Sequence, residues 1–573
     1  MVQHVNPIGR IRVISLFLAA CVCLIIIKLF FVQIVNGSYY SEIADRQYAT
    51  PRGSIFDRGS IFFKERSGNL ISAAGLKSGY IIAINPQKIT DKEGAYLKLE
   101  KHIKDLDHDV FIKKVSKEKD PYEEIAHRVS RENVDAISAL EIPGVSVYKE
   151  KWRFYPAGTM SAQVIGFTAY KGDIIAGRYG IERQYNNVLE RGKNGLYVNF
   201  FAEVFSSLRS TLSSDAINKE GDLVLTIEPS VQSYLQKTVK GINEKYSSEE
   251  TGAIIINPMD GSIYAIEVTP GFDLNKFQEV ENVALFSNPL VENVYEMGST
   301  VKALTMAAAL DKGAVKANTT YNDTGSLTFN GYTIYNYDKK GRGVTTMQHV
   351  LDESLNTGVA FAMQKMGKDE FKKYFLSFGF GEKTGIDLPN EGRNLISNLN
   401  TNRDIEFANA SFGQGIAMTP ISTIRALAIL GNGGYIVTPH LVSEIEYKGG
   451  INKKIETPLG AQVIKKETSE EITRMLVQVV DKALLGGTVK MPHYSIAAKT
   501  GTAQIALPNG KGYYDDRYLH SFFGYFPAYN PKFLIFIYTK NPKGEKYASH
   551  TLTYPFMDMA KFLLSYYEVP PDR

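Results

Sequence analysis

Residues 252–268 read GAIIINPMDGSIYAIEV, two apolar runs joined around Asp260-Gly261. An Asp-Gly pair between such runs is a strong hairpin signal, because both residues accept the backbone angles of the tight turns that join antiparallel strands. Just upstream, residues 223–246 read as a strand followed by an amphipathic helix. This part of the chain therefore predicts two adjacent antiparallel strands with a helix packed beside them.

Three more strand-like segments lie far downstream, at residues 495–507, 519–531 and 532–540, and a helical pattern follows at 554–567. Between the two groups of strands the chain is mostly helical and loop-like. We expect an α+β domain with an antiparallel sheet of about five strands and helices against its faces. The first two strands come from one end of the domain and the last three from the other.

The composition excludes several classes of protein. At 573 residues, with 44% apolar and 22% charged residues, the chain is largely globular and too long for one hydrophobic core. Its net charge of +4 is too close to neutral over this length to indicate a nucleic-acid partner. The two cysteines are Cys21 and Cys23, so the globular remainder can form no disulfide framework and no cysteine-based metal site. Nothing in the sequence indicates a metal or an organic cofactor.

An apolar run at residues 13–35 is broken only by Lys28 and one glutamine. Because about 20 helical residues cross a bilayer core, we expect a transmembrane anchor here. Arg10 and Arg12 precede the run, which by the positive-inside rule leaves residues 1–12 in the cytoplasm and exports the rest. The alternative, a buried helix of a soluble domain, is disfavoured because the few residues before it could not cover its surface. Lys28 either reaches the outer interface or contacts a membrane partner.

Three short motifs in the exported part carry chemistry. They are S-x-x-K at residues 299–302, S-x-N at 354–356 and K-T-G-T at 499–502. Each is weak alone, since such a serine or lysine is most often a helix cap or a solvated strand end. A second S-x-x-K at 116–119 lies in a charged run and a second K-T-G at 383–385 lies in a turn-rich loop, so we discount both. Together and in this order, the three motifs predict a catalytic site.

Ser299 is the predicted nucleophile. A hydroxyl needs a base within hydrogen-bond reach and donors aimed at the developing oxyanion, and Lys302 lies one helical turn further on, on the same face. A lysine acts as a base only when it is neutral, so burial or a neighbouring cation must lower its pKa. We expect Lys499 to be that cation, with Lys302 neutral and Lys499 charged.

The other motif residues suit a peptide substrate. Ser354 can pass a proton between lysine and a leaving amine, and Asn356 offers a donor and an acceptor to a peptide amide. Thr500, Gly501 and Thr502 lie on the K-T-G-T strand, where an extended peptide can pair by strand addition and the two hydroxyls can bind a carboxylate. The predicted reaction is acyl transfer from a peptide with a free C-terminal carboxylate.

With these motifs the chain resembles the class B penicillin-binding proteins, monofunctional peptidoglycan transpeptidases anchored by one membrane helix. Further blocks look like those of the family and follow its order, at residues 28–35, 52–59, 153–167, 179–189, 269–277, 384–392 and 411–421. The resemblance implies an α+β fold in four parts. These are a cytoplasmic tail (1–12), a transmembrane anchor (13–35), an elongated mixed α/β pedestal or dimerisation-type domain (36–220) and a transpeptidase domain (221–573).

The resemblance also assigns roles. Ser299 is acylated by the penultimate D-Ala of a stem peptide, the terminal D-Ala leaves, and an amine of a neighbouring strand then forms the cross-link. The backbone N–H groups of Ser299 and Thr502 form the oxyanion hole, and β-lactams acylate the same serine. Where the family has proline in its Y-E-P-G-S-T-x-K block this chain has Met297, which we expect to loosen the turn before the nucleophile. The Asn-Gly that usually follows the pair at 57–58 is also missing.

The compact segment between Tyr155 and Gly195 resembles that of division-specific members, so we expect a septal role, with elongation as the alternative. A membrane-anchored β-lactam sensor is disfavoured because the predicted cytoplasmic part is too short for an effector, and an idle scaffold is disfavoured by the intact motifs. The expected partners are peptidoglycan stem peptides on lipid II-derived glycan strands, β-lactams, the membrane, a polytopic lipid II glycosyltransferase and other divisome proteins. The expected location is the inner (cytoplasmic) membrane, single-pass, with the catalytic domain on the periplasmic or extracytoplasmic side.

Overall fold

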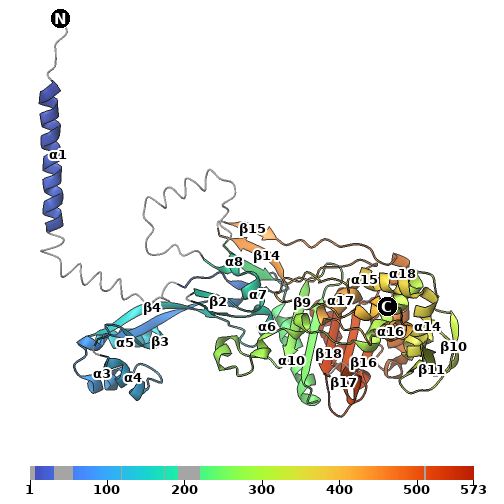
Figure 1. Cartoon of the computed structure of the whole chain (residues 1–573). Coiled ribbons are helices and arrows are strands. Elements are labelled where there is room, and N and C mark those ends of the chain that lie inside the picture. The colour runs from blue at the N-terminus through green and yellow to red at the C-terminus, as the bar shows by residue number, and fades with distance from the viewer. Residues whose placement is uncertain are drawn as a thin grey trace, which may run out of the picture. The chain divides into compact units, whose positions relative to one another are not determined.

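The computed structural model describes residues 7–30, 56–117, 119–172, 174–191, 220–448, 450–508 and 512–573 (Figure 1). The chain divides into two compact units. The first is made of residues 1–57 and 76–152, and the second of residues 58–75 and 153–573. All three predicted catalytic motifs fall in the second unit.

Helix α1 (Pro7–Phe30) covers most of the predicted anchor. Large apolar side chains along it are exposed, among them Leu16, Phe17 and Leu24. Residues 31–35, the rest of the predicted anchor, lie outside the described residues. In the part of the chain that the structure describes, no helix meets the length and apolarity that a membrane crossing requires. The transmembrane anchor therefore stays a prediction.

The first unit packs three short helices against strands. The second part of β2 (Leu70–Ile84) pairs antiparallel with β3 (Glu123–Val129), and β4 (Val145–Phe154) also pairs with β2. The helices are α3 (Lys92–Leu99), α4 (His108–Val115) and α5 (Arg131–Ala139). Each begins at a residue whose side chain accepts a hydrogen bond from the first turn, namely Asp91, Asp107 and Ser130. Aliphatic side chains and Phe111 fill the space between helices and strands.

Besides three two-stranded sheets, the second unit contains strands of two larger sheets, and one of these two holds none of the catalytic motifs. In it, β1 (Ile61–Lys64) pairs antiparallel with the first part of β2 and parallel with β7 (Gly221–Leu225). Strand β7 also pairs antiparallel with β14 (Val442–Tyr447), which pairs with β15 (Ile451–Lys454). The strand predicted before the hairpin is thus present, and it belongs to a different sheet from the hairpin itself.

The central sheet has five antiparallel strands in the order β16-β17-β18-β8-β9. Strands β8 (Glu250–Ile256) and β9 (Ile263–Thr269) form the hairpin predicted around Asp260-Gly261. The downstream strands are β16 (Ala497–Ala506), β17 (Tyr513–Phe526) and β18 (Phe533–Lys540). Figure 1 shows β9 in green beside β16–β18 in red, so the two ends of the domain meet in one sheet. The predicted five-stranded antiparallel sheet is confirmed.

Helices cover both faces of this sheet. Successive residues of each strand point to opposite faces, and on β8 the residues of both faces are apolar and buried. On β8, Ala253 and Ile255 join a core formed with α10 (Pro229–Lys245) and α20 (Thr553–Tyr566). Ile254 and Ile256 point the other way, into the larger core, which contains α12 (Val301–Asp311) and α17 (Pro420–Ala428). Fully burying each of these isoleucines stabilises the fold by about 1.5–3 kcal/mol.

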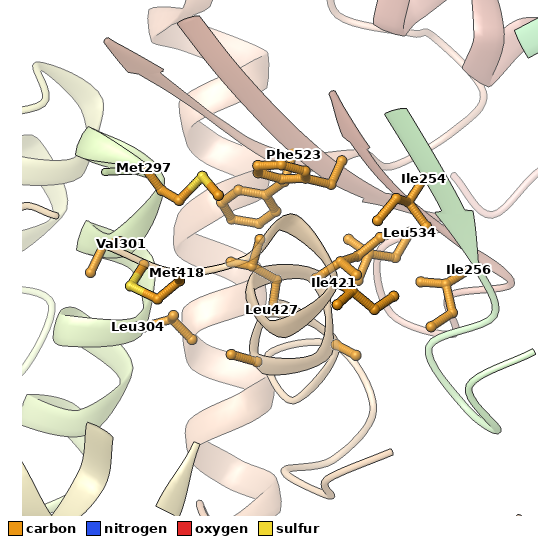
Figure 2. Close-up of a cluster of buried hydrophobic side chains, with 14 of the residues drawn as sticks. Ile254, Ile256, Met297, Val301, Leu304, Met418, Ile421, Leu427, Phe523 and Leu534 are labelled. Carbon is orange, nitrogen blue, oxygen red and sulfur yellow. The ribbon is translucent and has the colours of Figure 1, made fainter. Parts of the chain in front are cut away.

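Figure 2 shows how the larger core links the sheet to the predicted nucleophile helix. Ile421 and Leu427 of α17 lie between the sheet residues Phe523 and Leu534 on one side and Val301 of α12 on the other. Helix α17 is buried along its whole length, as its apolar sequence requires. The sheet, α17 and α12 thus form consecutive layers that fix the position of residues 299–302.

The remaining elements of the second unit are short. They are α6 (Ala162–Ile165), β5 (Thr168–Lys171), β6 (Ile174–Gly177), α7 (Gly180–Gln184), α8 (Asn186–Leu189), α11 (Pro289–Glu292), β10 (Thr320–Asp323), β11 (Ser326–Phe329), β12 (Tyr332–Tyr335), β13 (Gly343–Thr346), α13 (Met347–Asp352), α14 (Asn356–Met366), α15 (Lys368–Ser377), α16 (Asp404–Ser411), α18 (Lys466–Gln478) and α19 (Ala548–Thr551). Strands β5 and β6 form one small hairpin and β11 and β12 another, while β10 pairs antiparallel with β13 around the second hairpin in sequence.

Three of the sequence blocks noted above meet in one buried ion network. Glu182 is fully buried, and its carboxylate accepts hydrogen bonds from Arg58 Nε and Arg153 Nε, each over 2.6 Å. Arg153 also donates to the carbonyl oxygen of Gly59 over 2.7 Å. Because charges buried together must pair, this network ties residues 58–59 to the segments around 153 and 182.

Candidate active site

The predicted nucleophile lies in a short 3-10 turn, Gly298–Thr300, that leads into α12. Gly298 has φ +58°, in the left-handed region that favours glycine, and a Cβ there would lie 3.0 Å from the carbonyl oxygen of Thr502. From the other side, a Cβ on Gly501 would lie 2.6 Å from the carbonyl oxygen of Met297. The turn and strand β16 therefore touch through two glycines, which sets Ser299 directly against the K-T-G-T strand.

Met297, which occupies the usual proline position, is fully buried. Its carbonyl oxygen accepts hydrogen bonds from Thr300 Oγ1 over 3.0 Å and from Ser521 Oγ of β17 over 2.9 Å. On the opposite side, Gly298 donates its N–H to the carbonyl oxygen of Gly413 over 3.1 Å. The loosening that we expected from the loss of proline is opposed by these bonds, which hold the turn from both sides.

Lys302, Ser354 and Lys499, one from each motif, lie together in the structure. Lys302 is in the first turn of α12, and its Nζ donates to the carbonyl oxygen of Ser354 over 2.5 Å and to Ser354 Oγ over 3.2 Å. Lys499, on β16, donates to Ser354 Oγ over 3.0 Å and to the carbonyl oxygen of Thr500 over 3.3 Å. Both lysines are almost completely buried, at 1% and 2% exposed. Ser354 is therefore the residue on which the two amines meet.

The backbone of Ser354 is itself unusual. It has φ +56°, a left-handed conformation that costs a residue with a side chain about 1–2 kcal/mol. The turn between α13 and α14 enforces it, because Ser354 donates its N–H to Leu351 and Leu355 donates to Val350. Strain of this kind is typically kept at functional positions. Here it aims both the carbonyl and the hydroxyl of Ser354 at the lysines.

The surroundings lower the pKa of both lysines. Burial, and then the charge of Lys499, lower the pKa of Lys302 well below its ordinary value. Burial lowers the pKa of Lys499 to about 8, and the nearby carboxylate of Asp352 opposes this by favouring the charged form. These shifts favour a neutral Lys302, while the carboxylate of Asp352 favours a charged Lys499. The hydroxyl of Ser354 thus has the amines of both lysines within hydrogen-bond distance.

Two residues that the motifs did not identify support this arrangement. Asp352 ends α13 and is held by Gln348 Nε2 over 2.9 Å and Gln478 Nε2 over 3.2 Å, so its carboxylate is fixed near Lys499. Ser521 pairs with Gly501 across the sheet and holds Met297. The position of Asp352, two residues before Ser354, is a signal that the sequence does contain. Ser521 has no local signal, since its role depends on strand register.

The remaining predicted residues lie around this cluster. Asn356 begins α14 and donates its Nδ2 to the carbonyl oxygen of Tyr335 over 2.8 Å. Thr502 Oγ1 accepts the N–H of Ala548 over 3.1 Å. Among the residues that the structure describes, Ser299 Oγ makes no hydrogen bond to either lysine. The amine of Lys302 instead donates its hydrogen bonds to Ser354. Nucleophile–base bonds often tighten only when substrate binds.

The described part of the chain contains no group of three or more His, Cys, Asp or Glu side chains placed to hold a metal ion. The groups that the structure brings together at this site are a serine hydroxyl, two buried lysines and backbone N–H donors. This set of groups can activate a hydroxyl for attack on a carbonyl, stabilise the resulting oxyanion and return a proton to a leaving group.

Comparison with known proteins agrees with this site. The model of the penicillin binding protein transpeptidase domain matches residues 251–558, and that of the penicillin-binding protein dimerisation domain matches residues 47–204. The chain is 30% identical to stage V sporulation protein D of Bacillus subtilis (strain 168), over 97% of this chain and 85% of that protein. It is 28% identical to the peptidoglycan D,D-transpeptidase FtsI of Escherichia coli (strain K12), over 75% of this chain and 70% of that protein.

Solved structures agree as well. Penicillin binding protein 3 from Mycobacterium tuberculosis aligns with a TM-score of 0.65 at 25% identity, over 74% of this chain and 92% of that one. Penicillin binding protein 2X from Streptococcus thermophilus aligns with a TM-score of 0.72 at 18% identity, over 89% of this chain and 80% of that one. The second likeness concerns the fold alone.

Proposed function

The chain belongs to the class B penicillin-binding proteins, and from this premise we propose that it is a peptidoglycan D,D-transpeptidase working through an acyl-enzyme on Ser299. The observation that carries the proposal is the meeting of Lys302 and Lys499 on Ser354, beside the turn that holds Ser299. A buried neutral amine next to a buried ammonium is costly, and it suits a site that must both take up and return a proton.

In the proposed mechanism Ser299 Oγ attacks the carbonyl carbon of the penultimate D-Ala, and its proton passes to neutral Lys302. The backbone N–H groups of Ser299 and Thr502 stabilise the oxyanion. The C–N bond then breaks, and the proton returns through Ser354 to the nitrogen of the departing D-Ala. An acceptor amine attacks the acyl-enzyme, loses a proton by the reverse route and restores Ser299. Lys499 holds Ser354 and, with Thr500, Gly501 and Thr502, binds the substrate carboxylate and backbone.

Labelling with a fluorescent penicillin tests this proposal, because a β-lactam imitates the acyl donor. We expect Ser299→Ala to abolish the covalent adduct and Lys302→Arg to slow its formation greatly without unfolding the protein. The chain supplies matched controls in its second S-x-x-K and second K-T-G sequences, so Ser116→Ala and Lys383→Arg should label normally. Label that persists in Ser299→Ala would contradict the assignment of the nucleophile.

The cellular role that we propose is septal wall synthesis. Support comes from the relatives named FtsI and from the resemblance of residues 155–195 to division-specific members. A role in the wall made during sporulation is a second candidate, because a relative matching 97% of the chain carries a sporulation name. Depletion in growing cells separates the possibilities. Filaments support division, swollen round cells support elongation, and normal growth with defective spores supports sporulation.

We also propose a single-pass anchor in the cytoplasmic membrane, with residues 1–12 in the cytoplasm and a polytopic lipid II glycosyltransferase among the partners. The apolar run at 13–35 and the exposed side chains of α1 support the anchor. Extraction of membranes with carbonate tests it, since a spanning protein stays in the pellet. The partner rests on family analogy, and co-purification in mild detergent tests it.

The proposed boundaries remain a pedestal at 36–220 and a transpeptidase domain at 221–573. The unit that holds the catalytic motifs also includes residues 58–75 and 153–191. A fragment that begins at 221 would contain β7 without β1, the strand with which it pairs, so part of the β7 backbone would lack its hydrogen-bond partners. We therefore expect such a fragment to be less stable than the full chain, which thermal unfolding of both proteins tests.

A further inference from the structure

Six exposed side chains near the site have no part in the proposed reaction. They are Tyr335, Tyr337, Lys339, Lys340, Lys546 and Tyr547, and we call them the tyrosine–lysine rim. We propose that this rim binds the glycan strand that carries the stem peptides. The proposal rests on the proposed function, because it takes the carrier of that function's substrate as the ligand.

The first half of the rim is built around a buried asparagine. Asn336 donates its Nδ2 to Asp323 Oδ1 and Oδ2, over 3.1 and 3.0 Å, and to the carbonyl oxygen of Lys340 over 3.2 Å. Because Asn336 points inward, its neighbours Tyr335 and Tyr337 point outward, and they are 48% and 52% exposed. The buried carboxylate of Asp323 thus holds the loop in one conformation.

This half is fixed to the S-x-N motif. Thr357, the residue after Asn356, donates its hydroxyl to Asp323 Oδ1 over 2.8 Å and its N–H to Asn336 Oδ1 over 3.2 Å. Asn356 itself donates to the carbonyl oxygen of Tyr335 over 2.8 Å. The two tyrosines are therefore positioned by the same residues that form one wall of the site.

The second half is fixed to the K-T-G-T strand. Tyr547 directly precedes Ala548, whose N–H donates to Thr502 Oγ1 over 3.1 Å. The carbonyl oxygen of Lys546 makes a hydrogen bond of 3.0 Å with Nε2 of buried His520, which pairs with Thr502 across the sheet. Lys546 and Tyr547 thus extend from the other wall of the site.

The two halves touch. The rings of Tyr337 and Tyr547 form an edge-to-face pair with centroids 6.0 Å apart and an interplanar angle of 79°. The walls to which they belong also meet at Ser354, through its bond to Lys499. The rim is therefore continuous across the mouth of the site. A stem peptide whose reacting end lies at Ser299 must emerge there, and the sugar to which it is attached must lie outside.

The chemistry of the rim suits a sugar chain with carboxylate groups. Lys339 Nζ lies 5.5 Å from the centre of the Tyr335 ring and Lys546 Nζ 5.7 Å from that of Tyr547. Within the described residues, Lys339, Lys340 and Lys546 form no ion pair. The C–H face of a pyranose can stack on an exposed tyrosine, while phenol and ammonium groups donate to sugar oxygens and carboxylates. A free stem peptide has no sugar for the rim to bind.

Binding of full-length Ser299→Ala protein to two probes tests the proposal. One is soluble peptidoglycan glycan strands from which an amidase has removed the peptides, and the other is a free stem pentapeptide. We expect Tyr337→Ala with Tyr547→Ala, and separately Lys339→Glu with Lys546→Glu, to weaken glycan binding about tenfold, as loss of central contacts commonly does. The lysine variant should also lose most of the salt dependence. Affinity for the pentapeptide should change much less.

Two matched controls distinguish the rim from general surface effects. Tyr554→Ala removes a tyrosine of α20 that is more exposed than the two rim tyrosines replaced. Lys365→Glu reverses a lysine that lies 5.4 Å from the Phe361 ring near the end of α14. Both should bind glycan as the parent does, and melting temperatures of all variants verify folding. Unchanged glycan affinity in folded rim variants, or an equal loss of pentapeptide affinity, overturns the proposal. Penicillin labelling of protein with Ser299 intact reports separately on the proposed function.

Discussion

Lys499 donates a hydrogen bond to Ser354 Oγ over 3.0 Å, although 145 residues separate the two in sequence. The bond joins the edge strand of the central sheet to the turn between α13 and α14, and Lys302 completes it from α12. The three motifs therefore converge on Ser354, the first residue of the S-x-N motif. Because Ser354 contacts both amines, its hydroxyl is placed for the proposed transfer of a proton from Lys302 to the leaving amine.

Replacement of Ser354 tests that route. We expect Ser354→Ala to slow acylation by a fluorescent penicillin at least about 100-fold, since a positioned proton-transfer group contributes about 10²–10⁴-fold. Ser354→Gly also lacks the hydroxyl but accepts φ +56° without strain. The acylation rate should therefore fall by the same factor in both variants, while the glycine variant melts at a higher temperature than the alanine variant. Stopped-flow labelling and thermal unfolding measure the two effects, and a fast glycine variant would contradict the relay.

The acylation rate should fall as the pH rises through about 8. Lys499 must carry a charge to hold Ser354 and the substrate carboxylate, and burial lowers its pKa to about 8. Lys302 must be neutral, and its pKa is lowered well below the ordinary value, so it sets the acid side of the profile. Lys499→Arg should react more slowly and keep its rate at higher pH, because arginine stays protonated. An alkaline limb that does not move in this variant would exclude Lys499 as its cause.

The sequence motifs predict the convergence of Lys302, Ser354 and Lys499, because each motif carries its own local geometry. They do not predict that the amine of Lys302 donates hydrogen bonds to Ser354 and makes none with Ser299. That preference follows from the φ angle of Ser354, which depends on how α13 and α14 pack. The contribution of Ser521 depends on the register of β17 against β16, which no local pattern encodes.

Gly501 should tolerate no side chain. A Cβ there would lie 2.6 Å from the carbonyl oxygen of Met297, a backbone atom that cannot move without displacing the nucleophile turn. We expect Gly501→Ala to lower the free energy of unfolding by about 1–3 kcal/mol and to slow acylation. Gly241, inside α10, has open space around it, so Gly241→Ala should be neutral or stabilising by up to about 1 kcal/mol. Chemical denaturation compares the two variants. Equal stability would show that the carbonyl group of Met297 moves aside at little cost.

The fold divides similarly into what local patterns determine and what they do not. The Asp260-Gly261 turn and the apolar runs predict β8 and β9, and the three downstream runs predict their partners. The pattern at 221–225 predicts a strand, but its pairing with β1 and β14 is set by contacts distant in sequence. Arg58 and Glu182 lie in different sequence blocks, and nothing in either block predicts that the two form a buried ion pair.

That pair leads to a stability prediction. Glu182→Gln leaves the buried guanidinium groups of Arg58 and Arg153 without their carboxylate, and breaking such a pair costs about 3–5 kcal/mol. The exposed pair of Lys240 and Glu244 is the matched control, because Glu244→Gln should cost less than about 0.5 kcal/mol. Urea unfolding of both variants measures the difference. A loss at Glu182 no larger than that at Glu244 would mean that the network contributes little.

Glu267 should make the stability of the protein depend on pH. It is buried on β9, where its carboxylate accepts hydrogen bonds from Gln232 Nε2 over 2.6 Å, Gln236 Nε2 over 3.3 Å and the N–H of Ser161 over 3.1 Å. Burial outweighs these bonds and raises the pKa of Glu267 to about 8. The folded protein therefore holds a proton here that the unfolded chain releases above its ordinary carboxyl pKa.

The sign follows from that proton. A raised pKa in the folded state gives stability that is complete at acid pH and is lost as the pH rises, by about 1.4 kcal/mol per unit, until the pKa of about 8 is reached. Glu267→Gln keeps an acceptor for the same donors and cannot ionise. Its melting temperature should exceed that of the parent by a margin that grows from pH 5 to pH 8 and then levels off. A constant margin over this range would mean that Glu267 is ionised in the folded protein throughout.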